Sequence, residues 1–266
     1  MNRAPTNMKI HPKKSLGQNF LVDQNILNKI IDACDLQTDE TVFEIGPGKG
    51  ALTKPLSAHV KKVIAVEKDK HLAALLNEEL KESNVAVITN DILKFSFEEL
   101  PDSIKLVGNL PYNIASPIIG KIIEHRHKFS NVYLMLQLEH VERMLARPNT
   151  KDYGSFSCFV QYYAKIKKLF NISNKSFQPA PKVLSCFVHL TFPENKKPKA
   201  QNDELLFKII RCAFNQRRKN ILNSLSPLKS KPDIIELLNS LDIDIGKRAE
   251  NLTLEDFVRI ADSFDR

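Results

Sequence analysis

The stretch Phe43-Glu44-Ile45-Gly46-Pro47-Gly48-Lys49-Gly50 decides the fold of this chain. It continues an apolar run typical of a buried strand and leads into a helical pattern that begins near Ala51. Glycines at such a junction let the backbone turn tightly and approach a ligand closely. We therefore expect an α/β fold with a small molecule bound at the end of this strand.

Short β-rich runs alternate with helical patterns from residue 41 to residue 192. Strands that alternate with helices predict a mostly parallel sheet covered by helices. The helical patterns carry apolar stripes, such as Leu72 with Leu76 and Ile118 with Ile122, which we expect to be core. The strands predicted in this region are 41–45, 62–66, 85–89, 105–107 and 132–136.

Two later runs, 165–172 and 186–192, are joined by a connection too short for a parallel crossover. They predict an antiparallel hairpin at one edge of the sheet. A polar stretch with two prolines follows, and the chain after it holds only helical patterns, so we place a domain boundary there. The expected organisation is a catalytic domain over residues 1–193, a linker over 194–202 and a small all-helical C-terminal domain for RNA recognition over 203–266.

Two carboxylates that end later strands indicate a nucleoside-containing cofactor. Glu67 lies 21 positions after Gly46, where a carboxylate can accept both ribose hydroxyls of an adenosine. Asp91 ends the third strand, where it can accept the amino group of an adenine. The glycine spacing also fits a dinucleotide fold, but Pro47 removes an amide donor that a pyrophosphate would use. S-adenosylmethionine therefore fits better than NAD, while solvated acids beside a plain turn are the alternative interpretation.

A tetrapeptide after the fourth strand, Asn109-Leu110-Pro111-Tyr112, matches methyl transfer to a conjugated amine. The lone pair of an adenine amine is delocalised into the ring, so a protein must turn it outward by accepting both N–H bonds. The side-chain oxygen of Asn109 and the backbone carbonyl of Leu110 can do this without a strong base. Tyr112 offers a flat ring for a base taken out of its stack, and Phe177 can sandwich that base unless it is ordinary core. The predicted catalytic residues are Asn109, Leu110, Tyr112 and Phe177.

The net charge of +8 and the sequence pI near 9.2 favour a polyanionic partner. Basic residues gather in two regions, one before the first acidic residue, Asp23, and one from 143 to 182 that contains a single carboxylate, Asp152. The two regions can form one RNA-binding surface. Its predicted contacts include Lys13, Lys14, Arg143, Arg147 and Lys151.

The four cysteines lie far apart, with no CxxC pair and no histidine at metal-ligand spacing. We expect buried thiols in a reducing compartment, and neither a metal nor a disulfide. The sequence shows neither a signal-peptide pattern nor about 18 consecutive apolar residues. These features predict a soluble cytoplasmic protein, which we expect to be a monomer.

Taken together, the motifs resemble the ribosomal RNA adenine dimethyltransferase family, and most closely its small-subunit branch, which is associated with kasugamycin sensitivity. The resemblance spans nearly the whole chain. Five segments carry it in order: HPKKSLGQNFL (11–21), EIGPGKGALT (44–53), NLPY (109–112), FQPAPKVLS (177–185) and FNQRRK (214–219).

The resemblance implies a Rossmann-like class I methyltransferase domain with seven strands and S-adenosylmethionine as the methyl donor. The implied substrate is a pair of adjacent adenines in the 3′-terminal hairpin loop of small-subunit (16S) rRNA, which receive four methyl groups during 30S subunit biogenesis. The family's Gln-Asn-Phe-Leu segment closes over the cofactor. The implied cofactor contacts are therefore Asn19, Leu21, Gly46, Glu67, Asp91 and Asn109.

A basic motif near the start of the helical domain, Arg217, Arg218 and Lys219, also matches the family. It implies phosphate contacts or domain anchoring, and a solvated helix face is the alternative. One departure from the family pattern is Leu184, where a polar residue often precedes the serine.

Three other functions are consistent with parts of the sequence. The large-subunit branch shares the catalytic domain, but Leu110 and the closing segment 248–257 look like the small-subunit branch. A ribosome-assembly or transcription factor would contact RNA without needing Asn109 and Tyr112. A dehydrogenase would bind NAD and would have no use for two base-stacking aromatic residues.

Overall fold

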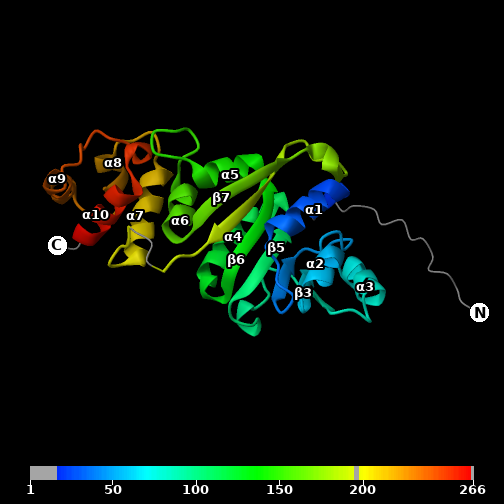
Figure 1. Cartoon of the computed structure of the whole chain (residues 1–266). Coiled ribbons are helices and arrows are strands. Elements are labelled where there is room, and N and C mark those ends of the chain that lie inside the picture. The colour runs from blue at the N-terminus through cyan, green and yellow to red at the C-terminus, as the bar shows by residue number, and fades with distance from the viewer. Residues whose placement is uncertain (1–16, 195–197, 265–266) are drawn as a thin grey trace, which may run out of the picture. The chain divides into compact units, whose positions relative to one another are not determined.

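The computed structural model describes residues 17–194 and 198–264, which form two compact units (Figure 1). Of the described residues, the first unit contains 17–138 together with Leu169–Val188. The second contains Glu139–Lys168 and the chain from His189 onward. The predicted RNA contacts Lys13 and Lys14 lie outside the described residues.

A seven-stranded sheet is the framework of the fold, with the strand order β4-β3-β2-β5-β6-β9-β7. The strands from β4 to β6 pair in parallel, and β9 with the edge strand β7 supplies the antiparallel part. The predicted mostly parallel sheet with an antiparallel edge hairpin is therefore confirmed. The strands are β2 (Thr41–Ile45), β3 (Lys62–Glu67), β4 (Val85–Thr89), β5 (Ile104–Asn109), β6 (Phe129–Gln137), β7 (Lys165–Ile172) and β9 (Ser185–Thr191).

The strand order reverses at β2. From β2 the chain continues to β3 and β4 on one side, and then crosses to β5 on the other side. The carboxyl ends of these strands are aligned, because Ile45 pairs with Val66 of β3 and with Gly108 of β5. Open α/β sheets bind ligands in the crevice at such a switch point. Both sequence motifs, the glycine turn and the tetrapeptide, follow strands that end there.

The helices of the first unit pack on the sheet through the predicted apolar stripes. In α4 the side chains of Ile118 and Ile122 are fully buried, and Leu72 and Leu76 of α3 are also buried, so these core predictions are confirmed. Burying one such side chain contributes about 1.5–3 kcal/mol, which fixes each helix and the loop before it. These helices are α1 (Gln24–Ala33), α2 (Thr53–His59), α3 (Lys70–Glu79) and α4 (Ala115–Glu124).

A second, two-stranded sheet joins segments that are far apart in the sequence. Strand β1 (Phe20–Leu21) pairs antiparallel with β8 (Phe177–Gln178), and Leu21 lies opposite Phe177. The Ser176 hydroxyl donates to Asp23 Oδ2 at 2.9 Å beside this pair. The N-terminal segment is thereby attached to the proline-containing segment that precedes β9.

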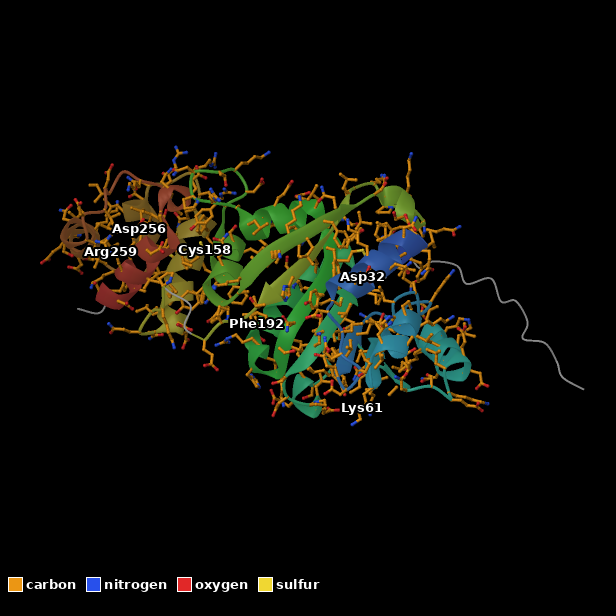
Figure 2. The ribbon with its side chains drawn as sticks, viewed as in Figure 1. Asp32, Lys61, Cys158, Phe192, Asp256 and Arg259 are labelled. Carbon is orange, nitrogen blue, oxygen red and sulfur yellow. The ribbon has the colours of Figure 1, made fainter. Side chains whose placement is uncertain are left out.

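The second unit is helical around a core of its own. Helix α5 (Leu138–Leu145) leads into this unit, and α6 (Ser155–Tyr163) contributes Cys158 and Tyr162 to the same apolar cluster as the C-terminal helices. In Figure 2, Cys158, Asp256 and Arg259 mark this unit, and Asp32 and Lys61 mark the first. The C-terminal helices are α7 (Asp203–Asn215), α8 (Ile221–Leu225), α9 (Lys231–Ser240) and α10 (Leu254–Ser263).

Three of the four cysteine side chains are buried, and that of Cys212 is partly exposed. Within residues 17–194 and 198–264, no helix has both the length and the apolar character needed to cross a membrane. The same part of the chain shows no group of three His, Cys, Asp or Glu side chains that could hold a metal ion.

Candidate active site

A pocket opens at the carboxyl ends of the parallel strands, where the sheet reverses its order. The glycine turn after β2 forms one wall, and the tetrapeptide after β5 forms another. Among the predicted cofactor contacts, all six line this pocket: Asn19, Leu21, Gly46, Glu67, Asp91 and Asn109.

The glycine turn has a backbone that other residues adopt only with strain. Gly46 and Gly48 have φ values of 71° and 57°, in the left-handed region that favours glycine. A Cβ atom at Gly48 would lie only 3.1 Å from the ring of Phe20, so the absent side chain also makes room for the N-terminal segment. The Gly46 N–H donates to the Val66 carbonyl at 3.0 Å, which fixes the turn against β3.

Glu67 is held in place from two sides. Its Oε2 accepts the Gly48 N–H at 3.0 Å, and its Oε1 accepts the Asp69 N–H at 2.8 Å. Burial raises the pKa of this carboxyl, while the two N–H donors act in the opposite direction. Each carboxylate oxygen can accept a second hydrogen bond. Glu67 is therefore prepared to receive two hydroxyl groups, as a ribose requires.

Asp91 presents an ionised carboxylate at the next strand end. Lys68 Nζ lies 2.8 Å from Asp91 Oδ2, and the Leu93 N–H donates to Oδ1 at 3.0 Å. The hydrogen bond from Lys68 lowers the pKa of Asp91. A charged acceptor at this place suits the amino group of an adenine.

Glu44 is a pocket residue to which the sequence analysis gave no role of its own. Its side chain is 1% exposed, and its Oε2 has no hydrogen-bond partner among the described residues. Burial raises the pKa of Glu44 to about 8. A buried carboxyl with an oxygen that lacks a partner favours a cationic ligand, since a nearby positive charge stabilises its ionised form. S-adenosylmethionine carries both a sulfonium and an ammonium group, so Glu44, Glu67 and Asp91 together fit this cofactor. The one sequence signal was an acid inside an otherwise apolar strand run.

Asn109 has a defined side-chain orientation at the end of β5. Its Nδ2 donates to the Asn19 backbone carbonyl at 3.2 Å, so Oδ1 is directed the other way. The next residue, Leu110, is buried, and its N–H donates to the Met135 carbonyl at 3.1 Å. Both predicted acceptors of the substrate amine therefore belong to a turn that is fixed on two sides.

The two predicted aromatic residues lie in different environments. Tyr112 lines the pocket, and its hydroxyl lies 2.7 Å from the Ser185 Oγ. Burial raises the pKa of Tyr112, so the phenol is neutral. Phe177 is 3% exposed in the core cluster that also contains Leu21, and it does not line the pocket. The structure thus brings Tyr112 to the site and places Phe177 in the core beside it.

The predicted RNA contacts that the structure describes all belong to the second unit. Arg147, Lys151, Arg218 and Lys219 are exposed, and the Arg143 guanidinium lies over the Phe156 ring. Arg217 has a different environment. Its Nη2 donates to the carbonyls of Lys151 and Tyr153, at 3.0 and 3.1 Å, and contacts Glu250 at 3.3 Å. These contacts favour anchoring within this unit over phosphate binding for Arg217.

The parallel sheet, the glycine turn and the acids at successive strand ends define a class I S-adenosylmethionine-dependent methyltransferase. Residues 10–266 match the ribosomal RNA adenine dimethylase family, and the chain belongs to this family. It is an enzyme that transfers methyl groups from S-adenosylmethionine to adenine in ribosomal RNA.

Curated relatives from two genera extend over nearly the whole chain. A Clostridium botulinum protein named ribosomal RNA small subunit methyltransferase A is 41% identical over 254 residues, covering 94% of this chain and 92% of the relative. A Bacillus pumilus protein of the same name is 41% identical over 265 residues, covering 94% and 90%.

Solved structures show the same fold. A dimethyladenosine transferase from Plasmodium falciparum has a TM-score of 0.78 at 30% identity, covering 91% of this chain and 95% of that one. The 23S rRNA methyltransferase ErmE has a TM-score of 0.70 at 25% identity, covering 93% and 100%.

Proposed function

We propose that this enzyme dimethylates N6 of two adjacent adenines in the 3′-terminal hairpin loop of small-subunit (16S) rRNA, as part of 30S subunit biogenesis. The observation that carries the proposal is the fixed orientation of Asn109, whose Nδ2 is bound to Asn19 while Oδ1 is directed away. Relatives that are 41% identical over most of the chain are named for the small subunit, which favours this rRNA over the large-subunit one.

The proposed catalytic roles follow from this orientation. Asn109 Oδ1 and the Leu110 carbonyl accept both N–H bonds of the adenine amine, which turns its lone pair away from the ring plane. The bound cofactor supplies an electrophilic methyl group. Tyr112 supports the flipped base by stacking, and positioning of the amine supplies much of the rate enhancement. Phe177 would complete the sandwich only after leaving its core position.

The proposed cofactor contacts divide among three acids. Glu67 holds the ribose hydroxyls, Asp91 accepts from the adenine amine, and Glu44 faces the cationic end. Asn19 and Leu21, on the segment that lies over the glycine turn, close the pocket. The Gln18 amide donates to Asp69 Oδ2 at 3.3 Å, which adds a contact between that segment and the start of α3.

We also propose that the partly buried Arg143 and the exposed cations Arg147, Lys151, Arg218 and Lys219, with Lys13 and Lys14, contact rRNA phosphates. The protein is proposed to act as a cytoplasmic monomer, with residues 1–193 as the catalytic domain and 203–266 as the recognition domain. The free thiols support a reducing compartment.

The decisive experiment gives the purified protein methyl-labelled S-adenosylmethionine and, in separate reactions, unmethylated small subunits, mature large subunits and protein-free large-subunit rRNA. We expect the label in dimethyladenine of the small-subunit 3′ hairpin. Label in large-subunit rRNA would assign the enzyme to the other branch. Cofactor binding without any label would indicate an assembly factor.

A further inference from the structure

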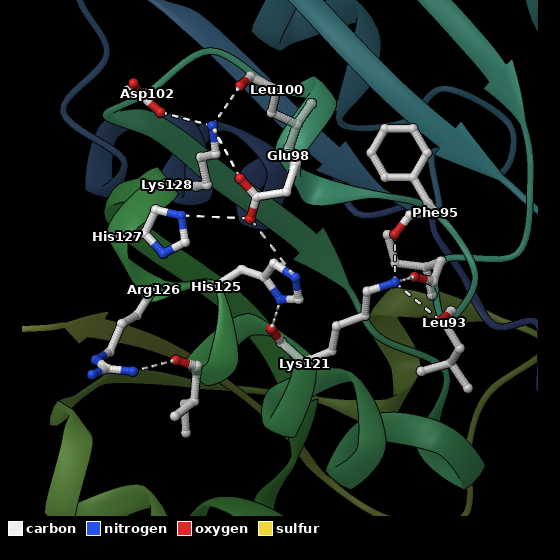
Figure 3. Close-up of polar contacts among 12 residues, drawn as sticks. Leu93, Phe95, Glu98, Leu100, Asp102, Lys121, His125, Arg126, His127 and Lys128 are labelled. Carbon is white, nitrogen blue, oxygen red and sulfur yellow. Dashed lines mark hydrogen bonds and ion pairs between the residues drawn. The ribbon is translucent and has the colours of Figure 1, made fainter.

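Lys121 lies on α4, and its ammonium group contacts backbone carbonyls of the turn that follows β4 (Figure 3). Nζ donates to the carbonyl of Ile92 at 2.9 Å and to that of Leu93 at 3.0 Å, and it also donates to the Phe95 carbonyl. All three carbonyls belong to the turn 91–95 that follows β4. A single side chain on α4 therefore binds three backbone carbonyls of this turn.

The turn 91–95 has only a few hydrogen bonds of its own. The Asp91 carbonyl accepts the N–H groups of Lys94 and Phe95, at 2.8 and 2.9 Å, and Asp91 Oδ1 accepts the Leu93 N–H. Backbone carbonyls that lie away from water require a donor. A lysine ammonium has three donors and no acceptor, so it matches a group of three carbonyls.

This turn forms part of the cofactor pocket. Asp91 and Ile92 line the pocket, whereas Lys121 does not. Ile92 connects the two: its carbonyl accepts a hydrogen bond from Lys121, and the residue also lines the pocket. Its side chain is 6% exposed, so its position is fixed by packing. A shift of the turn would move the Asp91 carboxylate relative to the strand ends that carry Glu67 and Gly46.

We propose that Lys121 is a positioning residue for the adenine of the cofactor: it holds the turn 91–95 so that Asp91 and Ile92 meet the base. This inference rests on the proposed role of Asp91 as the acceptor of the adenine amine. Helix α4 also follows the tetrapeptide 109–112 directly, through the short 3-10 helix Tyr112–Ile114. Lys121 therefore fixes the adenine turn to the helix that begins at the target-base turn.

Lys128 provides a matched control (Figure 3). Like Lys121, it is partly buried, and its Nζ contacts Asp102 at 2.8 Å, the Leu100 carbonyl at 3.4 Å and Glu98 at 3.6 Å. None of these three residues lines the cofactor pocket. Replacing Lys128 therefore removes a similar set of contacts without touching the turn 91–95.

The test compares Lys121→Met with Lys128→Met by calorimetric titration with S-adenosylhomocysteine and with S-inosylhomocysteine, in which an oxo group replaces the adenine amine. We expect Lys121→Met to weaken S-adenosylhomocysteine binding about tenfold, since hydrogen bonds that order the turn are lost, and Lys128→Met to leave it nearly unchanged. The loss should be much smaller for the inosine compound, which has no amine for Asp91 to accept. Lys121→Arg, which keeps a cation at this position, should recover most of the affinity.

Equal affinities of the two methionine variants for S-adenosylhomocysteine would overturn the inference. An equal loss of affinity for both ligands in Lys121→Met would also overturn it, because a purely structural lysine does not distinguish an amine from an oxo group. If circular dichroism shows that Lys121→Met is unfolded, Lys121→Gln and Lys128→Gln replace the two methionine variants in the same titrations. These measurements contain no RNA, so failure of the proposed rRNA substrate leaves their outcome unaffected.

Discussion

The two halves of the pocket differ in how completely they are formed. On the cofactor side, the glycine turn, Glu67 and Asp91 already have fixed hydrogen-bond partners. On the target-base side, Asn109 and Tyr112 are in place, but Phe177 is 3% exposed in the core. A cofactor that binds before every reaction benefits from a preformed site, whereas an RNA base can complete its own site when it arrives. The comparison predicts that changes on the two sides have separable effects.

The largest expected effect comes from Phe177, which lies in the core and does not line the pocket. Phe177→Ala should lower the free energy of unfolding by about 3–5 kcal/mol, because it leaves a cavity in the core. Denaturant unfolding followed by circular dichroism measures this change. Phe177→Leu keeps most of the volume and serves as the control. Full methyl transfer by Phe177→Leu would remove this ring from the proposed base site.

Asn109→Ala should lower the rate of methyl transfer by about 10²–10³-fold, as is usual when one oriented transition-state partner is removed from a closed site. Affinity for the cofactor should fall much less than the rate, since the three acids are intact. Single-turnover assays and calorimetry separate the two quantities. Asn113→Ala, at a neighbouring position that also lines the pocket, is the matched control. Equal loss of rate and of cofactor affinity would contradict the division of the pocket into two sides.

Glu67→Gln should have the opposite effect to Asn109→Ala: it should lower cofactor affinity more than the rate of methyl transfer. The variant replaces one acceptor oxygen by an NH2 donor, which faces the N–H group of either Gly48 or Asp69, so we expect cofactor affinity to fall about 30-fold. The rate at saturating cofactor should change little. Titration with S-adenosylhomocysteine gives the affinity, and a fall in rate that saturating cofactor does not restore would move Glu67 to the target-base side.

Glu44 should give a smaller effect that depends on pH. Its pKa is about 8 in the free protein, so the carboxyl is mostly protonated at pH 7. A cationic ligand favours the carboxylate, so binding should release a proton, and affinity should rise up to about tenfold per pH unit until it levels off above pH 8. In the free protein the same raised pKa makes the Glu44 contribution to stability decrease as pH rises from about 4.5 to 8.

Calorimetry in two buffers with different ionisation enthalpies measures the released proton. Glu44→Gln should remove most of the pH dependence of binding. Unchanged pH dependence in that variant would assign the proton to another group, such as Glu67, whose pKa is also raised.

Local sequence patterns predicted most of the fold and the cofactor side. The strands 41–45, 85–89 and 165–172 have the predicted bounds, because apolar alternation and flanking turns report local structure directly. The acids Glu67 and Asp91 were found because parallel strands end at one edge of the sheet, so position in the chain implies position in space.

The features that the sequence missed or left open depend on contacts between distant segments. The contacts of Lys121 are backbone carbonyls, which every residue has, so no residue type marks them. The core position of Phe177 depends on its pairing with Leu21, more than 150 residues earlier. For Arg217 the sequence left phosphate contacts and domain anchoring open, because its carbonyl partners in the segment 151–153 carry no sequence signal.

The pairing of β1 with β8 also orders events during synthesis of the chain. Leu21, which lines the cofactor pocket, has its strand partner at Phe177, so that wall cannot be secured until the ribosome has made the proline-containing segment. The glycine turn is translated early, but the pocket wall that contains Leu21 forms only after most of the first unit has been translated. A nascent chain of this enzyme acquires its complete methyl-donor pocket only after residues 177–178, two-thirds of the way along the 266-residue chain, have been translated.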